Sequence, residues 1–393
     1  MKKGLLGIMT VILLSAMISC ATGSGEDPGS LKDETWPDLP VAIKSGIGVM
    51  VDDVIYVGLG SAGSSFFALD LKSRTPVWEE KSAFPGPVPT SAAAAASGKR
   101  IYVFGGNGKE TPEAKAPILF DTVYSYDIKK DRWDVVDTVT PAGLLGASAY
   151  ACDTDSIAFF GGYNKEKFDK YLSDIKSVDK NENPDEWNRI VDDYMGMEPD
   201  GYEWNKKVLV YNTNLNSWSD LGDNPYQPNC GSAIAELDDS LMIINGEIKP
   251  GLRTSKVKSA AFEGASITWE LLEELPAPAG QEIQEGLAGA FAGVSNGSVI
   301  VAGGANFHGA KAQAAAGNWF SHKGLGKAYN PEVYVYTDNQ WEQVSSLDMG
   351  LAYGSSFTIP EGVLCIGGED GERNKHSAVF LLSWDGETIT IQD

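Results

Sequence analysis

A β-branched and aromatic run that ends in glycine recurs six times along this chain. The six runs occupy residues 54–60, 101–106, 157–162, 241–246, 299–304 and 363–368. A second strand-like run and then a tryptophan follow each of the first five, and these tryptophans are Trp78, Trp133, Trp218, Trp269 and Trp341. A segment rich in small residues, such as residues 231–235, precedes the glycine-ending runs. Self-similarity at this period predicts one large repeat architecture rather than two ordinary domains.

The order of these features indicates four short strands in each repeat. The glycines follow the second strand, the tryptophan opens the fourth, and Gly, Asp, Asn and Ser supply the turns. This order resembles the kelch repeat of β-propellers, so the predicted fold is an all-β, six-bladed kelch-type β-propeller. Glycine suits the crowded region near the axis because it lacks a Cβ, and the tryptophans supply large apolar area between blades.

The third repeat carries an insertion at about residues 163–205, after its glycine pair. Apolar residues recur there at helical spacing in two groups, from Phe168 to Ile175 and from Trp187 to Tyr194. Asn183 before Pro184, with acidic residues next, is typical of a helix start. We therefore expect a short helical insertion of two helices. Since it leaves a second strand, it is expected to form a wall or lid over the channel mouth.

The N-terminal residues predict export from the cytoplasm. Lys2 and Lys3 precede an apolar run, residues 4–18, that is too short for an ordinary membrane span. The run leads into Ser19-Cys20, and the four residues that end at Cys20 resemble the bacterial lipobox. The sequence therefore predicts a lipoprotein-type signal peptide at residues 1–20, with Cys20 as the lipidation site. An ordinary cleaved signal with an incidental cysteine is the alternative.

The rest of the chain divides into a tether and the propeller. Residues 21–33 are rich in Gly, Ser and acidic residues, which favours a flexible tether, and residues 34–393 hold the six blades. We expect a periplasmic protein that contacts a bacterial membrane through its lipid anchor only. Residues 378–383 and 388–392 are typical of a last hairpin, so the C-terminal strand is expected to complete its own blade.

The charge of the chain limits its partners. A formal net charge of −23 without basic stripes argues against nucleic acid. A small anionic ligand is still compatible, because a few convergent basic groups in a cleft set the local field.

Cysteine and histidine are too few to suggest a metal centre or a disulfide framework. No metal and no cofactor are expected from three histidines, His308, His322 and His376. Three cysteines beyond the leader lie in apolar segments, and we expect buried small hydrophobes, with one chance pair as the alternative: Cys152, Cys230 and Cys365.

The loops that follow the six glycine runs are predicted to converge on one mouth of the channel. The fourth loop departs most from a plain repeat, because it places Glu247 and Arg253 six positions apart around a Pro-Gly turn. This spacing can bring a carboxylate and a guanidinium to one ligand, and a structural salt bridge inside the loop is the alternative. Further candidates for ligand binding, each with solvent exposure or blade-to-blade hydrogen bonding as its alternative role, are Ser61, Asn107, Asn164, Glu285, Asn306 and Glu369.

Several segments carry a more specific resemblance than the repeat: residues 36–40, 58–63, 245–254, 284–286, 289–293 and 303–307. Together they resemble the bacterial N-acetylneuraminate epimerases, also called sialic acid mutarotases, from about Thr35 to the C-terminus. The run Asn-Gly-Glu-Ile-Lys-Pro-Gly-Leu-Arg at residues 245–253 is the most specific of them. The resemblance implies that Glu247 is the proton acceptor and that Arg253 accompanies it. Family members are periplasmic, and the lipobox departs from that pattern.

The resemblance implies an isomerase that exchanges the α and β anomers of N-acetylneuraminate by opening and closing the sugar ring. Glu247 is then expected to accept and return the proton of the anomeric hydroxyl, and Arg253 to bind the substrate carboxylate. The proton donor to the ring oxygen stays open among Glu285, Glu369, a tyrosine and water. A non-catalytic propeller that binds a glycan or a protein at the cell surface is the alternative function.

Overall fold

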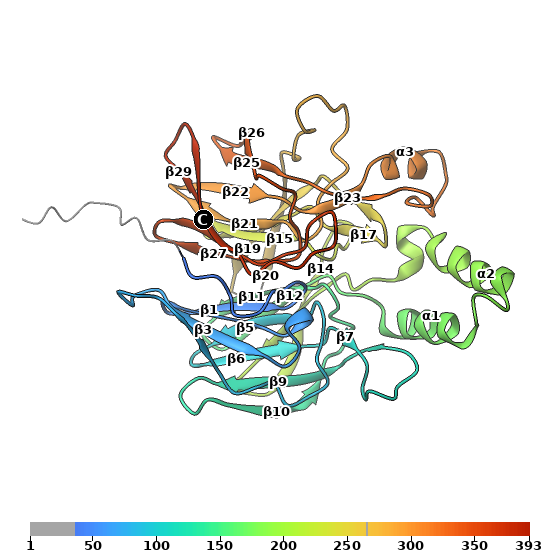
Figure 1. Ribbon diagram of the computed structural model, residues 1–393, viewed down its shortest axis with the longest axis horizontal. Helices are drawn as coiled ribbons and strands as arrows, with labels where there is room; N and C mark the ends of the chain where they lie inside the picture. Colours follow the sequence, from blue (N-terminus) through green and yellow to red (C-terminus); the bar gives the residue numbers. More distant parts are fainter. Residues whose placement is uncertain (1–35, 265) are drawn as a thin grey trace, which may run out of the picture. The chain divides into compact units, whose positions relative to one another are not determined.

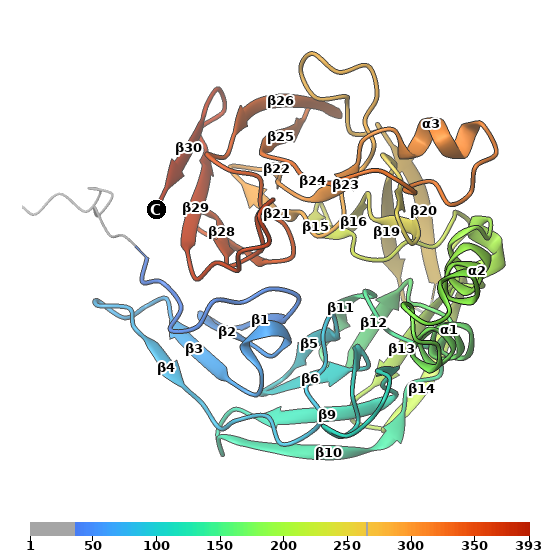
Figure 2. The same ribbon diagram turned by 45° about the vertical axis from the view of Figure 1, so that its right-hand side comes forward.

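The computed structural model describes residues 36–264 and 266–393, and the predicted signal peptide, the tether and Cys20 lie outside them. Six four-stranded antiparallel sheets surround a central axis (Figure 2), which confirms the predicted six-bladed β-propeller. The first blade contains β1 (Ile47–Val51), β2 (Val54–Gly58), β3 (Phe66–Asp70) and β4 (Trp78–Glu80). The second contains β5 (Ala93–Ser97), β6 (Arg100–Phe104), β9 (Thr122–Asp127) and β10 (Arg132–Val139). The third contains β11 (Ser148–Asp153), β12 (Ser156–Phe160), β13 (Lys207–Asn212) and β14 (Ser217–Asp223).

The last three blades follow the same order. Their strands are β15 (Ala233–Leu237), β16 (Ser240–Ile244), β19 (Val257–Glu263) and β20 (Ser266–Leu272); β21 (Phe291–Ser295), β22 (Ser298–Ala302), β25 (Glu332–Thr337) and β26 (Gln340–Ser346); β27 (Ser355–Ile359), β28 (Gly362–Ile366), β29 (Val379–Trp384) and β30 (Ile389–Gln392). Within the described ranges, no helix has both the length and the apolar character needed to cross a bilayer.

The repeated tryptophans join each blade to its neighbour. Trp133 on β10 is buried and packs against Phe66 of the first blade, with ring centroids 5.0 Å apart. Its Nε1–H donates to the carbonyl oxygen of Ser82, on the segment between the two blades, at 2.8 Å. Trp341 does the same with the carbonyl oxygen of Glu273 at 3.1 Å. These tryptophans therefore fill the space between blades, as predicted. Their indole N–H groups are also hydrogen-bonded.

Six backbone hydrogen bonds form a closed ring around the axis, which we call the backbone belt. One residue of each blade contributes to it: Ser45, Ser91, Gly146, Gly231, Gly289 and Tyr353. Each donates its N–H to the carbonyl oxygen of the residue before it in the ring, at 2.7–2.9 Å, and Ser45 closes the circle onto Tyr353. All six have φ between 50° and 67°, which favours glycine and is uncommon for a bulky residue such as Tyr353.

A segment before the first blade fastens the last blade to it, and we call residues 36–44 the N-terminal strap. Leu39 donates its N–H to the carbonyl oxygen of Ser377 at 2.8 Å, and Gly368 donates to that of Ile43 at 2.8 Å. On the other side, Trp78 of the first blade donates its Nε1–H to the carbonyl oxygen of Pro37 at 2.8 Å. Because β30 pairs with β29, the C-terminal strand completes its own blade, as predicted.

The loops after the second strands are enlarged, and their additions lie at one end of the molecule (Figure 1). In the first blade this loop holds the short 3-10 helix η1 (Gly60–Ala62). Small two-stranded sheets extend the second, fourth and fifth blades: β7 (Asn107–Gly108) with β8 (Ile118–Leu119), β17 (Glu247–Lys249) with β18 (Leu252–Arg253), and β23 (Ala305–Phe307) with β24 (Lys327–Tyr329).

The third-blade insertion contains α1 (Lys165–Ser177), α2 (Pro184–Met195) and η2 (Pro199–Tyr202), so both predicted helices are confirmed. Asn164 caps α1 by accepting the N–H of Lys167 at 3.0 Å. Asn183 precedes α2, with Pro184 in its first turn, but its side chain makes no capping hydrogen bond, contrary to the expected cap. A third helix, α3 (Ala310–Ala315), follows β23 and was not expected.

The three cysteines of the described residues are unpaired. Cys230 and Cys365 are buried, as predicted, whereas Cys152 is only half-buried. The Sγ of Cys230 accepts the backbone N–H of Gly162 at 3.2 Å, so this thiol also holds the third-blade loop against the fourth blade.

Candidate active site

The residue that follows the glycines occupies an equivalent position in every blade. In blade order these residues are Ser61, Asn107, Tyr163, Glu247, Ala305 and Glu369. Asn107, Glu247, Ala305 and Glu369 each form an antiparallel bridge to the residue directly before a member of the backbone belt. The six positions are therefore arranged around the axis beside the belt. Three of these positions carry ionisable side chains, Tyr163, Glu247 and Glu369, and Ala305 separates the last two.

Glu247 and Arg253 form an ion pair across the β17–β18 hairpin. The two residues are direct cross-strand partners, and Glu247 Oε1 lies 2.7 Å from Arg253 Nη2. Arg253 is almost fully buried, with 3% of its side chain exposed, whereas Glu247 is 20% exposed. The salt bridge that the sequence left as an alternative therefore exists. Arg253 Nε and Nη1 are nevertheless buried without a hydrogen-bond partner in the described chain, so the guanidinium retains donors for a ligand.

Two tyrosines from other blades lie beside this ion pair. Tyr163 of the third blade donates its hydroxyl to Glu247 Oε2 at 3.3 Å. Burial, followed by the negative charge of Glu247, raises the pKa of Tyr163 well above its ordinary value, so the phenol stays protonated. Tyr353 of the sixth blade also lies beside the pair. Burial raises the pKa of Tyr353 above its ordinary value, against the opposing effect of the Arg253 charge. Both tyrosines therefore present neutral hydroxyl groups to the pair.

The tight turn of the hairpin is required by His322, which packs against it. Gly251 has φ +83°, and a Cβ at this position would lie 1.7 Å from Nδ1 of His322. Phe307 stacks obliquely on His322 and also lies under Arg253, whose guanidinium carbon is 4.9 Å from the Phe307 ring centroid. Burial, with the charges of Lys249 and Arg253, lowers the pKa of His322 to about 4. His322 is thus neutral at pH 7 and contributes packing rather than charge.

Lys249 attaches the helical insertion to the β17–β18 hairpin. Its side chain is fully buried and donates to the carbonyl oxygens of Met195, at the end of α2, and Trp319, at 2.9 and 2.5 Å. Burial lowers the pKa of Lys249 to about 8, since no carboxylate is in direct contact with it. The insertion is therefore a wall held next to Glu247, as the sequence predicted for residues 163–205.

A second carboxylate, Glu369, lies in the sixth blade with its own cation. Glu369 is 4% exposed, pairs with Lys44 of the N-terminal strap, and accepts a hydrogen bond from the Tyr329 hydroxyl. Tyr329 packs edge-to-face on Tyr353, with centroids 6.4 Å apart. Glu369 is therefore connected to the Glu247 hairpin through Tyr329 and Tyr353. No pattern in the sequence had indicated these two tyrosines as site residues.

The other residues predicted to bind the ligand have structural contacts. Both oxygens of Glu285 accept backbone N–H groups at the start of α3, from Gly309 at 2.7 Å and Lys311 at 2.9 Å. Glu285 was expected to point into the channel. Because both of its oxygens are engaged by backbone N–H groups, it is not free to supply a proton at the channel mouth. The reason is that α3 forms just after β23 and brings unpaired N–H groups to this carboxylate.

Four polar candidates remain. Ser61 Oγ accepts the N–H of Lys44 at 3.0 Å, and the hydroxyl of Thr90 donates to Asn107 Oδ1 at 2.5 Å. Asn164 caps α1. Asn306 is 2% exposed, donates weakly to Asn330, and leaves Oδ1 without a partner among the residues described. Of these four, Asn306 is the one with a buried polar atom that lacks a partner among the described residues, and the role of all four in ligand binding stays a prediction.

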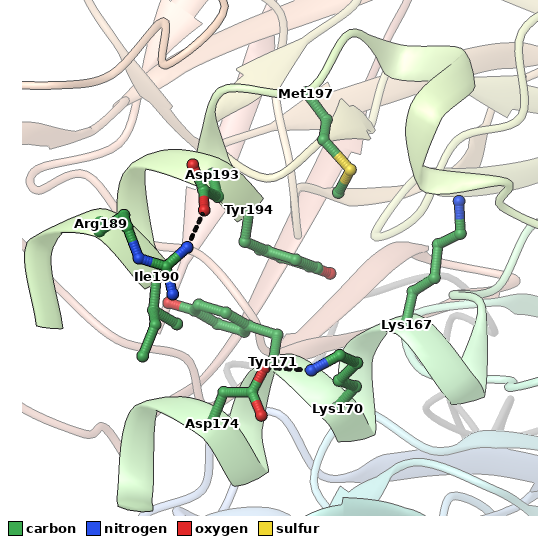
Figure 3. Close-up of a pocket in the computed structure, with 9 residues that line it drawn as sticks. All are labelled: Lys167, Lys170, Tyr171, Asp174, Arg189, Ile190, Asp193, Tyr194 and Met197. Carbon is green, nitrogen blue, oxygen red and sulfur yellow. Dashed lines mark hydrogen bonds and ion pairs between the residues drawn. The ribbon is translucent and has the colours of Figure 1, made fainter. Parts of the chain in front are cut away.

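A pocket of about 450 Å³ lies within the insertion, between α1 and α2 (Figure 3). Tyr171 and Tyr194 stack there with centroids 4.0 Å apart. Its charged side chains are already engaged: Lys170 with Asp174, Arg189 with Asp193, and Lys167 with Glu203. This pocket therefore offers no unpaired charge for a ligand, in contrast to the Glu247 hairpin. In the part of the chain that the structure describes, no group of His, Cys, Asp and Glu residues is arranged to hold a metal ion.

The fold and the site define a class of protein: a six-bladed propeller with a carboxylate, tyrosines and cations gathered at one end of its axis. A family model described as N-acetylneuraminate epimerase matches residues 36–391. The chain belongs to the N-acetylneuraminate epimerase family, which confirms the resemblance noted from its sequence.

Individual relatives agree with this assignment. The chain is 51% identical over 361 residues to the N-acetylneuraminate epimerase of Vibrio cholerae, with 92% of this chain and 94% of the relative covered. It is 47% identical over 364 residues to the N-acetylneuraminate epimerase of Brucella melitensis, with the same coverage. Among solved structures, that of YjhT superposes with a TM-score of 0.85 at 32% identity, covering 91% of this chain and 99% of YjhT.

Proposed function

We propose that this protein is a sialic acid mutarotase, an isomerase that equilibrates the α and β anomers of N-acetylneuraminate. The observation that carries the proposal is the Glu247–Arg253 ion pair, at 2.7 Å, in a chain that belongs to the N-acetylneuraminate epimerase family. Glu247 is the more exposed member of the pair, so its carboxylate is open to a bound sugar.

Exchange of the two anomers requires the ring to open at the anomeric carbon and to close on the other face of the keto group. Glu247 takes the proton of the anomeric hydroxyl as the bond between this carbon and the ring oxygen breaks, and the ring oxygen is protonated. The open chain turns about the bond next to the keto group. Reversal of the proton transfers then closes the ring, so no proton is gained or lost overall and no cofactor is needed.

Arg253 and the tyrosines prepare the site for this chemistry. Arg253 orients Glu247 through Nη2 and keeps Nε and Nη1 for the substrate carboxylate. Tyr163 and Tyr353 are neutral hydrogen-bond donors beside the position where negative charge develops. Glu285 is excluded as proton donor by its contacts with α3, which leaves Glu369, a tyrosine or water for the ring oxygen.

The test is the rate at which the α anomer, freshly released by a sialidase, equilibrates in an NMR tube. Wild-type protein is expected to accelerate equilibration, and Glu247→Gln is expected to lower kcat by about 100-fold or more while remaining folded. Glu263→Gln is the matched control, because Glu263 ends β19 at the opposite end of the same blade. Uncatalysed rates with folded wild-type protein would show instead a propeller that only binds its ligand.

We further propose that the protein is exported and anchored to a bacterial membrane through Cys20. The support is the charged, apolar and lipobox-like order of residues 1–20. Labelling cells with a radioactive fatty acid tests this, since the protein should be labelled and Cys20→Ser should not. Release of unlabelled wild-type protein into the periplasmic fraction would favour an ordinary cleaved signal.

A further inference from the structure

The cations around Glu247 are not all balanced by carboxylates. Glu247 is paired with Arg253, and Glu369 is paired with Lys44, so each carboxylate is balanced. Lys327, at the start of β24, lies in the same neighbourhood, since its Nζ packs over the ring of Tyr353, and the charges of Arg253, Glu247 and Lys44 act on its pKa. Within the described chain, the ammonium of Lys327 has no ion pair and no hydrogen-bond partner. With Arg373, whose charge also acts on Lys327, these groups carry a net positive charge, which suits a carboxylate on a ligand.

Aromatic rings hold Lys327 in this position. Its Nζ lies 4.2 Å from the ring centroid of Tyr353 and 5.1 Å from that of Tyr329. Tyr353 is the belt residue next to Arg253, and Tyr329 is hydrogen-bonded to Glu369. A lysine over two ring faces is restrained without being neutralised, so its charge remains available to an incoming anion. Its side chain is exposed to solvent, whereas that of Arg253 is almost fully buried.

We propose that Lys327 binds the carboxylate of the substrate together with Arg253, and this inference rests on the proposed function. Arg253 approaches the carboxylate from the buried side through Nε and Nη1, and Lys327 approaches it from the solvent side. The carboxylate is bonded to the anomeric carbon, so holding it at this point sets the anomeric hydroxyl next to Glu247. The same two cations overcome the repulsion expected from a chain with a net charge of −23.

The electrostatic state of Lys327 supports this role. Its pKa is lowered to about 8, first by loss of hydration among the surrounding protein atoms and next by the positive charge of Arg253. Lys327 is exposed, but its Nζ lies over the rings of Tyr353 and Tyr329, which take the place of part of its water shell. An anion bound between the two cations removes their repulsion, so the ligand and the proton on Lys327 stabilise each other.

The experiment compares N-acetylneuraminate with its methyl ester, which has the same ring and no charge. Lys327→Met keeps the length of the side chain over the two tyrosines and removes the charge. We expect Lys327→Met to raise KM for the acid by about 10- to 100-fold. Its KM for the ester is expected to stay within about twofold of the wild-type value, and kcat for the acid should change little. Lys327→Arg should restore much of the affinity for the acid.

Lys323→Met is the matched control. Lys323 lies in the same loop and over an aromatic ring, 5.3 Å from the centroid of Phe320, but it is ion-paired with Asp192. Its replacement should leave KM for the acid unchanged. Equal weakening of acid and ester by Lys327→Met, or a loss confined to kcat, would overturn the assignment of Lys327. Wild-type protein without mutarotase activity would overturn the proposed function instead, and calorimetric binding of the acid and the ester would still test Lys327.

Discussion

Tyr353 and Gly289 are held against each other at two points. The N–H of Tyr353 donates to the carbonyl oxygen of Gly289 at 2.7 Å, as part of the backbone belt. The ring of Tyr353 fills the space where residue 289 would carry a side chain, since a Cβ there would lie 2.4 Å from Cδ1 of Tyr353. The belt thus places a bulky residue at φ +67° directly beside Arg253 and Lys327. Uncommon backbone conformations of this kind concentrate at functional sites.

Gly289→Ala is therefore expected to damage the site, because the added methyl group must displace the Tyr353 ring. We expect a loss of at least about tenfold in kcat/KM. Gly231→Ala is the matched control: it has nearly the same φ, +64°, but its Cβ would meet nothing closer than Ala288 Cβ at 3.8 Å. It should cost about 1–2 kcal/mol of stability, with activity largely kept. Equal loss of activity in both variants would show that the belt, and not the Tyr353 ring, is what matters.

Removal of the Arg253 guanidinium should destabilise the hairpin as well as impair catalysis. Arg253→Gln leaves Glu247 without its cation, so we expect the free energy of unfolding in urea to fall by about 1–3 kcal/mol. Glu247→Gln combined with Arg253→Gln removes the unpaired charge, and the two effects should be less than additive. Strict additivity would mean that the 2.7 Å ion pair contributes no coupling energy.

The pH dependence of kcat/KM should report the charge on Lys327. Its pKa is about 8, so the free enzyme loses this cation as the pH rises further, and kcat/KM for the acid should then fall about tenfold per pH unit. The groups that face Lys327 are Arg253, Glu247, Lys44, Arg373, Tyr329 and Tyr353. In Lys327→Arg the fall should move to much higher pH, since arginine stays charged. A fall that keeps its midpoint in this variant belongs to another group.

Lys258 should make the protein more stable as the pH rises above neutrality. This lysine is 1% exposed, donates to the Gln227 carbonyl oxygen and to Asn229 Oδ1, and has no ion-pair partner in the described residues. Burial lowers its pKa to about 7. The unfolded chain keeps the proton up to about pH 10, so between these values it binds more protons than the folded state. The free energy of unfolding therefore rises with pH in this window.

The expected gain is on the order of 2 kcal/mol between about pH 7 and pH 9, measured by urea unfolding at each pH. Lys258→Met should remove the part of the rise that begins near pH 7, and Lys249, with a pKa of about 8, accounts for a later part. An unchanged pH profile in Lys258→Met would show that Lys258 does not release its proton in the folded protein.

The blades and the helices of the insertion could be predicted from the sequence because their signals are local. Alternating apolar residues, glycine pairs and tryptophans recur within each repeat, and Glu247 with Arg253 lies in one short motif. Tyr163 could have been found in the same way, because it occupies the position of Glu247 in the preceding blade. The expected role of Glu285 overlooked α3, although its alanine-rich sequence at residues 310–316 is a helix signal.

The other site residues depend on contacts between distant segments. Lys327 follows a long loop with no repeat pattern. Its importance comes from Tyr329 in the same strand and from Tyr353 and Arg253 in distant segments. The backbone belt is also invisible in the sequence, because three of its six members are not glycine and each bonds to a residue in another blade. Such pairings follow from ring closure and not from any local propensity.

The N-terminal strap limits how far the chain can be shortened from its N-terminal side without opening the ring. Pro37, Leu39 and Ile43 connect the first blade to the last, where no strand is shared between them. A protease that removed residues beyond Trp36 would remove the contacts of the strap and leave all six blades intact. The ring of blades could then open at the hydrogen bond between Ser45 and Tyr353. Trimming that stops upstream of Trp36 therefore keeps the strap, and protection of residues 36–44 from exopeptidases is a direct sign that the ring is closed.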